Sequence, residues 1–339
     1  MPDSPTNRRI VLAARPTGEP VPSDFRLETT PLPQPAEGQA LLKTLYLSID
    51  PYMRGRMNAG PSYAPPVGIG QIMGGAAVCE VLDSRTPELT PGDIVLSHTA
   101  WQDFAVADAQ TLRRLDPSLA PVTTALGVLG MPGLTAYTGL LNIGQPKPGE
   151  TVVVSAASGA VGSLVGQIAR IQGARAVGIA GGPRKCAFVR DVLGFDACLD
   201  HRSPSFPADL QAACPQGIDV YFENVGGPVF QAVLPLLNPF ARIPVCGLIA
   251  HYNATQLPPG PDRTPALMGP ILTKRLTFRG FIVTDYFSQL PEFLTTVSAW
   301  LQEGRIHYRE DIVEGLENAP TALIKMLQGR NFGKLIVKV

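Results

Sequence analysis

The chain has 339 residues, of which 45% are hydrophobic, so it can bury a large core and is long enough for two packed domains. Its 28 lysines and arginines balance its 28 aspartates and glutamates, and no net field attracts nucleic acid or an anionic membrane. Gly, Pro or charged residues interrupt every apolar stretch before it reaches the length of a membrane span, and the run Ile10–Ala14 is too short for a signal-peptide core. We therefore expect a soluble, cytoplasmic protein without nucleic-acid or membrane partners.

Five cysteines and four histidines are scattered along the chain without a C-x-x-C pair. The odd count and wide spacing argue against a disulfide framework and indicate a reducing compartment. A structural zinc site needs clustered thiolates or imidazoles, and the sequence offers no such cluster. The sequence thus predicts no bound metal.

The first third of the chain is typical of a β-rich, barrel-like unit. Up to about Leu126, Pro and Gly recur every few residues and separate short apolar runs. The terminal run Asn331–Val339 also has the pattern of a strand, and it could return to this first unit. The clearest predicted strands of the unit are Gln39–Ser48, Gly75–Leu82 and Asp93–Leu96.

From about Gly127 to Leu301, apolar strands alternate with helical patterns, which predicts an α/β unit with a parallel sheet. The predicted helices include Gly162–Gln172 and Lys185–Leu193. The predicted strands are Thr151–Ser155, Arg175–Ala180, Ala197–Asp200, Val220–Glu223, Ala241–Cys246 and Leu276–Phe281.

The segment Thr151–Gly162 carries the strongest chemical signal. A β-branched run fit for a buried strand leads into a Gly-rich turn and then an apolar helix, which is the context that confirms a G-x-G-x-x-G fingerprint. A helix N-terminus there would bind a pyrophosphate, although a tight strand-to-helix turn also favours glycine without any ligand. We predict a dinucleotide site in which Ala157 replaces the first glycine and which comprises Ala157, Ser158, Gly159, Ala160, Val161 and Gly162.

The end of the next predicted strand favours NADP(H) over NAD(H). An NAD site places a carboxylate there for the ribose 2′-hydroxyl, whereas this chain has Gly181 followed by Arg184 and Lys185. Two cations can bind a 2′-phosphate. The alternative is a solvated helix start whose basic residues are incidental.

Several strings resemble one known family along the whole chain. They are Ala156–Ser163, Ile218–Gly227, Arg242–Gly247, Gly130–Tyr137, Leu47–Met57 and Asn331–Val339, and they look like the zinc-independent medium-chain dehydrogenase/reductases of the leukotriene B4 dehydrogenase/prostaglandin reductase branch, which includes curcumin-reductase-like enzymes. The resemblance implies a homodimer whose subunit has a GroES-like β-barrel catalytic domain, here residues 1–126 and 302–339. It also implies a Rossmann domain with a doubly wound parallel sheet, here residues 127–301.

The same resemblance bears on the reaction. Zinc-dependent relatives carry a Cys and a G-H-E motif where this chain has Asp50 and Met73–Ala76, so metal-assisted alcohol oxidation is not expected. The implied reaction is hydride transfer from NADPH to the β-carbon of an α,β-unsaturated ketone or aldehyde. Tyr252 is the implied donor to the enolate oxygen, with Tyr63 and Tyr52 as possible substrate-lining residues. For each tyrosine the simpler interpretation is packing, with the hydroxyl at the surface.

The family resemblance also implies further contacts to the cofactor, at positions that match the family's own. The family often has Ser where this chain has Gly182, Glu where it has Arg184 and Tyr where it has His201, so the 2′-phosphate site departs from the family pattern. The additional implied contacts are Met131, Thr135, His201, Asn224, Cys246, Gly247, Phe281, Ile282, Val283 and Asn331, together with Tyr252.

Two alternatives remain open from the sequence. A quinone oxidoreductase would share the fold and the cofactor site, and would turn over quinones faster than enones. An NADPH-binding sensor or structural protein would bind the cofactor without efficient turnover.

Overall fold

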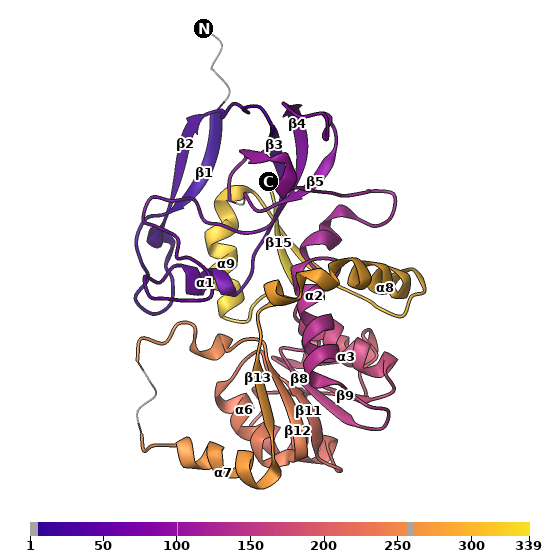
Figure 1. The fold of residues 1–339 in the computed structure, drawn as a ribbon. Coiled ribbons are helices and arrows are strands. Elements are labelled where there is room, and N and C mark those ends of the chain that lie inside the picture. The colour runs from indigo at the N-terminus through magenta and orange to yellow at the C-terminus, as the bar shows by residue number, and fades with distance from the viewer. Residues whose placement is uncertain (1–5, 100, 257–259) are drawn as a thin grey trace. The chain divides into compact units, whose positions relative to one another are not determined.

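The computed structural model describes residues 6–99, 101–256 and 260–339, and the chain divides into two compact units. Unit 1 combines Met1–Gly127 with Glu310–Val339, and unit 2 is Val128–Arg309 (Figure 1). The chain therefore leaves unit 2 eight residues later than the expected boundary at residue 302. Gln167 forms two hydrogen bonds with the backbone of His307, at 2.9 and 2.7 Å, and both residues belong to unit 2.

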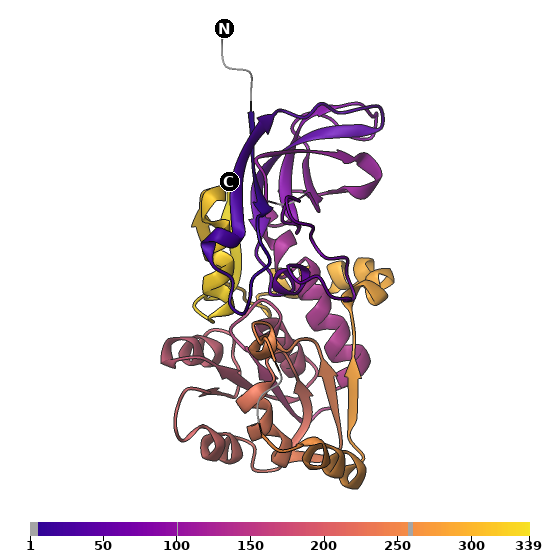
Figure 2. The same cartoon turned by 90° about the vertical axis from the view of Figure 1, so that its left-hand side faces the viewer.

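Unit 1 is a mixed sheet built from both ends of the chain, in agreement with the expected β-rich, GroES-like domain. Its strand order is β14-β15-β3-β4-β5-β7, with β6 also paired to β3 and a separate pair β1–β2. The yellow C-terminal segment lies beside the indigo N-terminal strands in Figures 1 and 2. The elements are β1 (Thr6–Leu12), β2 (Phe25–Pro31), β3 (Gln39–Ser48), α1 (Tyr52–Arg56), β4 (Ala77–Ser84), β5 (Ile94–Ser97), β6 (Phe104–Asp108), β7 (Arg113–Arg114), β14 (Glu310–Glu314), α9 (Ala319–Leu327) and β15 (Lys334–Lys338).

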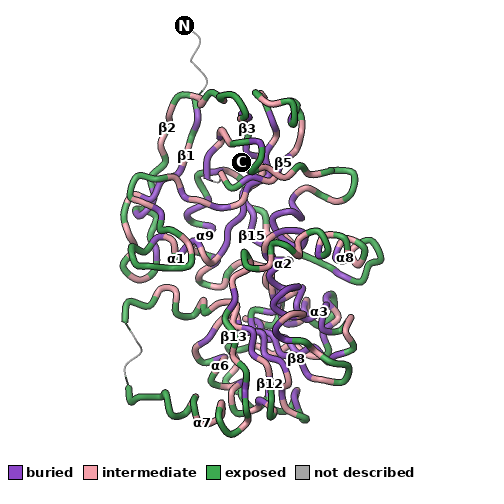
Figure 3. Tube along the Cα trace, in the orientation of Figure 1, coloured by how far each residue is buried: buried purple, intermediate pink, exposed green. Residues whose placement is uncertain are grey.

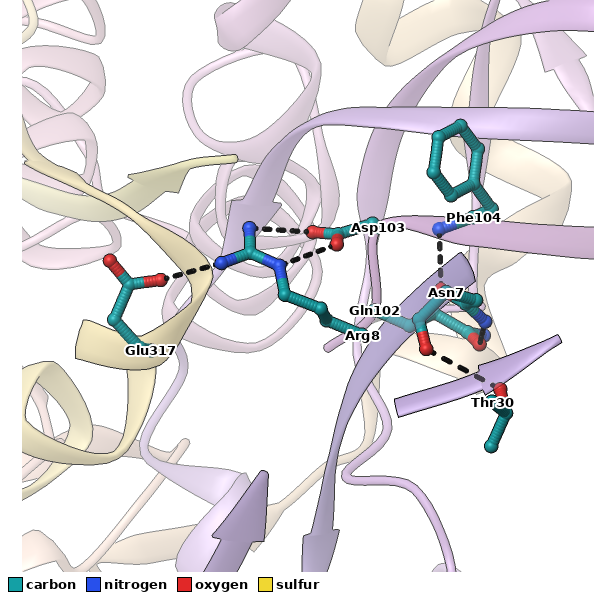
Figure 4. Close-up of polar contacts among 7 residues, drawn as sticks. All are labelled: Asn7, Arg8, Thr30, Gln102, Asp103, Phe104 and Glu317. Carbon is teal, nitrogen blue, oxygen red and sulfur yellow. Dashed lines mark hydrogen bonds and ion pairs between the residues drawn. The ribbon is translucent and has the colours of Figure 1, made fainter. Parts of the chain in front are cut away.

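Polar side chains hold β1 against the segment that precedes β6 (Figure 4). The Arg8 guanidinium forms two bonds with the Asp103 carboxylate, at 2.7 and 3.1 Å, and a third at 3.3 Å with Glu317. The Asn7 amide donates to Gln102 and accepts from the Phe104 backbone N–H. Because Asn7 and Gln102 are buried, these bonds satisfy polar groups that water cannot reach.

A buried ion pair joins the C-terminal strand to the middle of unit 1. Lys334 on β15 contacts the Asp50 carboxylate and the Ile49 carbonyl oxygen, the latter at 3.0 Å, and both charged residues are 4% exposed. Ser48 donates to the same carboxylate. The apolar core around the pair includes Leu47 and Val337. The pair thus ties β15 to the end of β3, with which it pairs antiparallel.

Unit 2 is a six-stranded parallel sheet with the order β10-β9-β8-β11-β12-β13. This order is that of the expected doubly wound dinucleotide-binding sheet, and the direction of winding reverses between β8 and β11. The elements are α2 (Met131–Thr138), β8 (Thr151–Ser155), α3 (Gly162–Ile171), β9 (Arg175–Ala180), α4 (Pro183–Asp191), β10 (Ala197–Asp200), α5 (Phe206–Ala213), β11 (Ile218–Phe222), α6 (Gly227–Val233), β12 (Leu237–Val245), α7 (Thr264–Lys274), β13 (Thr277–Gly280) and α8 (Leu290–Gln302).

Helices cover both faces of this sheet. Val153 and Val177 pack with Leu210 of α5 and Val229 of α6 in one apolar cluster. Gly178, the next residue on β9, faces the other way, since a β-carbon there would lie 2.9 Å from Val189 of α4. All five residues of β8 are buried, as Figure 3 shows in purple, which explains the uninterrupted β-branched run.

One helical segment of unit 2 was not expected from its sequence. After α2 the chain continues through a π-helical turn, Gly139–Gly144, which places Gly139 against two aromatic rings. A β-carbon at Gly139 would lie 2.4 Å from Phe281 and 2.9 Å from Phe222. Only glycine fits at position 139 without a clash. Because glycine has a low helix propensity, the glycines at both ends of this segment hide its helical character in the sequence.

We expect Lys334→Met to lower the free energy of unfolding of unit 1 by about 3–5 kcal/mol, because it leaves the Asp50 charge buried and unpaired. Lys338→Met on the same strand is the matched control, since its bond to Glu314 is exposed and should contribute at most about 1 kcal/mol. Urea unfolding followed by fluorescence of buried Trp101 would measure both. Equal losses for the two variants would contradict the role of the buried pair.

Candidate functional site

The turn after β8 has the geometry of a phosphate-binding loop. Ala156 has φ +52°, so the sharp bend lies one residue before Ala157, where the fingerprint would place its first glycine. Ala157 is instead fully buried and donates its N–H to Ile179 O at 2.9 Å. A β-carbon at Gly162 would lie 2.4 Å from Ala156 O, so only glycine lets α3 begin this close to the strand.

The predicted residues from Ala157 to Gly162 therefore lie together at the N-terminal end of α3. The Gly159 N–H donates to Ala156 O at 2.9 Å and closes the turn. Ser158 is buried, while Gly159, Ala160 and Val161 are partly exposed. A helix N-terminus carries partial positive charge, and backbone that is partly open beside it can receive a phosphate.

Glu223 organises the point at which the sheet reverses its winding. It follows β11, is 3% exposed, and its Oε1 accepts from Ser155 Oγ at 3.2 Å and from Tyr221 Oη at 2.9 Å. The same oxygen accepts the backbone N–H groups of Val225 and Gly226, at 2.7 and 2.9 Å. One carboxylate thereby joins the ends of β8 and β11.

Asn224, Cys246 and Gly247, which were predicted as cofactor contacts, meet at this same place. The Asn224 amide donates to Ser155 O at 2.8 Å. The N–H groups of Cys246 and Gly247 donate to Glu223 O at 2.9 and 3.1 Å. Burial raises the pKa of the Cys246 thiol to about 12, helped by the Glu223 charge, so the thiol stays neutral near pH 7.

Tyr252 lies over the backbone that follows β12. A β-carbon at Gly247 would lie 3.0 Å from Tyr252 Oη, and the same oxygen accepts the Leu248 N–H at 3.4 Å. Burial raises the pKa of the Tyr252 phenol above its usual value, opposed by the Leu248 bond. The group is therefore a neutral phenol whose proton can be donated to an oxygen that gains negative charge.

His251, the residue before Tyr252, lies against a different glycine. A β-carbon at Gly226 would lie 3.1 Å from His251 Cδ2. Neighbouring side chains therefore cover two separate glycines, His251 beside Gly226 and Tyr252 beside Gly247.

Basic groups gather at the carboxyl ends of β9 and β10. A β-carbon at Gly181 would lie 3.0 Å from His201 Nε2 and 3.1 Å from Arg202 Nε, so both side chains lie over the turn that precedes α4. Burial lowers the pKa of His201, and the charges of Arg202 and Lys185 lower it further. The sequence analysis missed Arg202, although its place two residues after a predicted parallel strand was a usable signal.

Asp200 is the acid nearest to this cluster in sequence, and its carboxylate is already engaged. Its Oδ1 accepts the N–H groups of Gly182 and Arg202, at 2.9 and 3.0 Å, and these bonds lower the pKa of the carboxyl against a burial that raises it. The carboxylate thus shapes the turn that carries the cations. Arg184 is exposed at the start of α4.

The remaining predicted contacts of unit 2 lie on α2 and after β13. The Thr135 hydroxyl donates to Met131 O, one helical turn earlier, at 2.8 Å. The Phe281 ring is buried and packs edge-on against Phe222, at 6.2 Å between centroids. Because the Phe281 side chain fills the core, only its backbone remains for a ligand. Ile282 and Val283 are partly buried.

The other predicted residues, Tyr52, Tyr63 and Asn331, belong to unit 1. Tyr52 begins α1 and packs on the core of unit 1, where burial raises its pKa above the usual value. Tyr63 is 63% exposed. Asn331 donates to Gly333 O at 3.0 Å. Their proposed roles remain predictions.

The position expected to distinguish this chain from zinc enzymes carries a different interaction. The Asp50 carboxylate binds the ammonium group of Lys334. Within residues 6–99, 101–256 and 260–339, no three His, Cys, Asp or Glu side chains come together as possible metal ligands. In the same ranges, no helix combines the length and apolar character needed to cross a membrane.

Comparison with known proteins identifies the family. Residues 8–115 match the family described as the N-terminal domain of oxidoreductase, and residues 160–299 match the family described as zinc-binding dehydrogenase. The NADPH-dependent curcumin reductase of Escherichia coli is 55% identical over 98% of this chain and 97% of its own length. The NADP(+)-dependent 2-alkenal reductase of Nicotiana tabacum is 39% identical over 100% and 99%. CurA from Vibrio vulnificus, crystallised with NADPH, is 54% identical over 98% and 99%, with a TM-score of 0.94. The chain therefore belongs to the zinc-independent medium-chain dehydrogenase/reductases, in the branch that contains the curcumin, alkenal and prostaglandin reductases.

Proposed function

We propose that this protein is an NADPH-dependent reductase of the C=C bond in α,β-unsaturated ketones and aldehydes. The observation that carries the proposal is the neutral phenol of Tyr252, which lies over Gly247 at the carboxyl end of β12. The names of the relatives point the same way, since they include a curcumin reductase and a 2-alkenal reductase.

The residues present fit a dinucleotide with a 2′-phosphate. The turn at Gly159 and Gly162 would hold the pyrophosphate at the N-terminus of α3. Lys185, His201 and Arg202 would hold the 2′-phosphate, and Arg184 starts the helix beside them. The acid nearest in sequence, Asp200, accepts the N–H groups of Gly182 and Arg202 at its Oδ1.

When bound, reduced NADP supplies a hydride to the β-carbon of the unsaturated carbonyl compound. The residues of this chain have to stabilise the negative charge that then appears on the carbonyl oxygen. A phenol that stays protonated at neutral pH can donate a hydrogen bond to that oxygen, which is the role we assign to Tyr252. Asn224 and Gly247 hold the adjacent backbone, and Tyr52, Tyr63 and Asn331 keep the substrate and phosphate roles that the family resemblance implies.

We further propose a cytoplasmic homodimer. Its five cysteines are free, as expected in a reducing compartment, and cell fractionation would test the location. The edge strand β13 is mostly exposed and can continue the sheet into a second copy across a twofold axis. Light scattering on the purified protein should give twice the chain mass of 36.1 kDa, and a single-chain mass would contradict the dimer.

NADPH oxidation measured against enals, enones and quinones tests the reaction. We expect turnover of enals and enones with a saturated carbonyl product, identified by mass spectrometry. Faster turnover of quinones would favour the quinone oxidoreductase, and NADPH binding without turnover of any acceptor would favour a sensor.

In the same assay, Tyr252→Phe should lower kcat roughly 10- to 100-fold, because one donor to the developing oxyanion is lost. The Kd for NADPH should not change. Tyr137→Phe is the matched control, since its hydroxyl binds Glu292 at 3.0 Å in the helical packing of unit 2. An unchanged kcat for Tyr252→Phe would remove this residue from the mechanism.

Arg202→Ala should raise the Kd for NADPH by about tenfold or more, because a charge-assisted bond to phosphate is lost. The Kd for NADH, which lacks the 2′-phosphate, should stay the same. Arg175→Ala is the control, since Arg175 lies at the opposite end of β9 and binds Ala213 O. Equal weakening of NADPH and NADH would show that Arg202 acts on the fold instead of the phosphate.

A further inference from the structure

His201 and Arg202 share the space over one glycine at the end of β9. A β-carbon at Gly181 would lie 3.0 Å from His201 Nε2 and 3.1 Å from Arg202 Nε. These two nitrogens are therefore within about 6 Å of each other, the range in which one charge alters the pKa of another group. Both residues are exposed, so a ligand can reach them from solvent.

Hydrogen bonds from two strands hold the turn beneath these side chains. The His201 N–H donates to Ala180 O at 3.0 Å, and the Gly182 N–H donates to Asp200 Oδ1 at 2.9 Å. Gly181 lies between these two bonds, at the carboxyl ends of β9 and β10. The imidazole is thus positioned at the edge where a sheet of this kind binds its dinucleotide.

Histidine changes its charge near neutral pH, whereas arginine and lysine stay protonated there. Partial burial of the ring lowers the pKa of His201, and the charges of Arg202 and Lys185 lower it further. The charge of Asp200 opposes this shift. Before a ligand binds, the imidazole is therefore mostly neutral at pH 7.

We propose that His201 takes up a proton when NADPH binds, so that the preference of this protein for NADPH over NADH increases as the pH falls. The inference rests on the proposed function, in which His201, Arg202 and Lys185 hold the 2′-phosphate. A phosphate dianion beside the ring favours its protonated form, which then donates a charge-assisted hydrogen bond to the phosphate. NADH has a hydroxyl in place of this phosphate and lacks the effect.

The sign of the proton exchange distinguishes His201 from the phosphate itself. A phosphate monoester loses its second proton with a pKa of about 6. Because the cations of the site favour the dianion, a site without a titrating histidine releases protons when NADPH binds near pH 7. Net uptake of protons therefore requires a basic group of the protein, and His201 is the histidine beside the proposed phosphate position.

Isothermal titration calorimetry on the full-length protein tests the proposal. The Kd values for NADPH and NADH are measured from about pH 6.5 to about pH 8.5, above the titration of the phosphate. Buffers of low and high ionisation enthalpy are compared, because their difference gives the number of protons exchanged. We expect net proton uptake with NADPH at pH 7 and none with NADH. The preference for NADPH should be about threefold to tenfold larger at the acidic end of the range, since one proton changes Kd by at most about tenfold per pH unit.

Three variants assign the proton to its residue. His201→Gln keeps a hydrogen-bond donor without a charge, and it should turn the uptake with NADPH into a small release. His201→Tyr introduces the residue that the family usually has, which stays neutral up to about pH 10, so its preference for NADPH should no longer increase at low pH. His307→Gln is the matched control, since His307 is exposed in the same unit and its backbone, which the substitution retains, binds Gln167. It should behave as the wild-type protein.

Two results would overturn the proposal. The first is that the wild-type protein releases protons, or exchanges none, when NADPH binds at pH 7. The second is that proton uptake persists in His201→Gln. In both cases the proposed function stands as long as NADPH binds more tightly than NADH. Equal Kd values for the two cofactors at every pH would instead contradict the 2′-phosphate site itself, and the inference with it.

Discussion

The hydrogen bonds of Glu223 hold together the carboxyl ends of three parallel strands, β8, β11 and β12. Its Oε1 accepts from Ser155 at the end of β8 and from Val225 and Gly226 after β11, while its backbone oxygen accepts from the first residues after β12. A charge that is 3% exposed is costly unless it is bonded in this way. Because the bonds come from several segments, the carboxylate acts as a common anchor for the loops of the dinucleotide site.

This anchor explains how a small number of residues can define the site. Tyr252 is placed by the loop that begins at Gly247, and that loop starts from a hydrogen bond to Glu223. Asn224 is placed by its bonds to Ser155. The cationic group around Arg202 is organised in the same manner by a second acid, Asp200. Glu223 and Asp200 thus act in the same way: each accepts backbone N–H groups and thereby fixes the loop that carries the proposed ligand-binding side chains.

Much of the fold could be predicted where a short apolar run lies between turn residues, because such a pattern is typical of a buried strand. The strands Thr151–Ser155, Arg175–Ala180 and Ala197–Asp200 were predicted with their observed bounds, since turn residues bracket short apolar runs. The strand β12 begins at Leu237 instead of Ala241, because Pro239 made its first half look like a loop. In the site, Gly162 was predictable from the fingerprint. Ser155 and Glu223 were not, because their roles depend on neighbours that are distant in sequence.

The pairing of β15 with β3 has a consequence for the order in which the two units are completed during synthesis. The lysine of the buried pair lies 284 residues after its aspartate, and all of unit 2 lies between them. Ribosomes add about 5–20 residues per second, so β3 waits many seconds for its partner strand. Unit 2 is contiguous in sequence and can fold during that interval. Unit 1 has an unpaired edge on β3 until β15 emerges, and an unpaired strand edge is prone to pair with other chains.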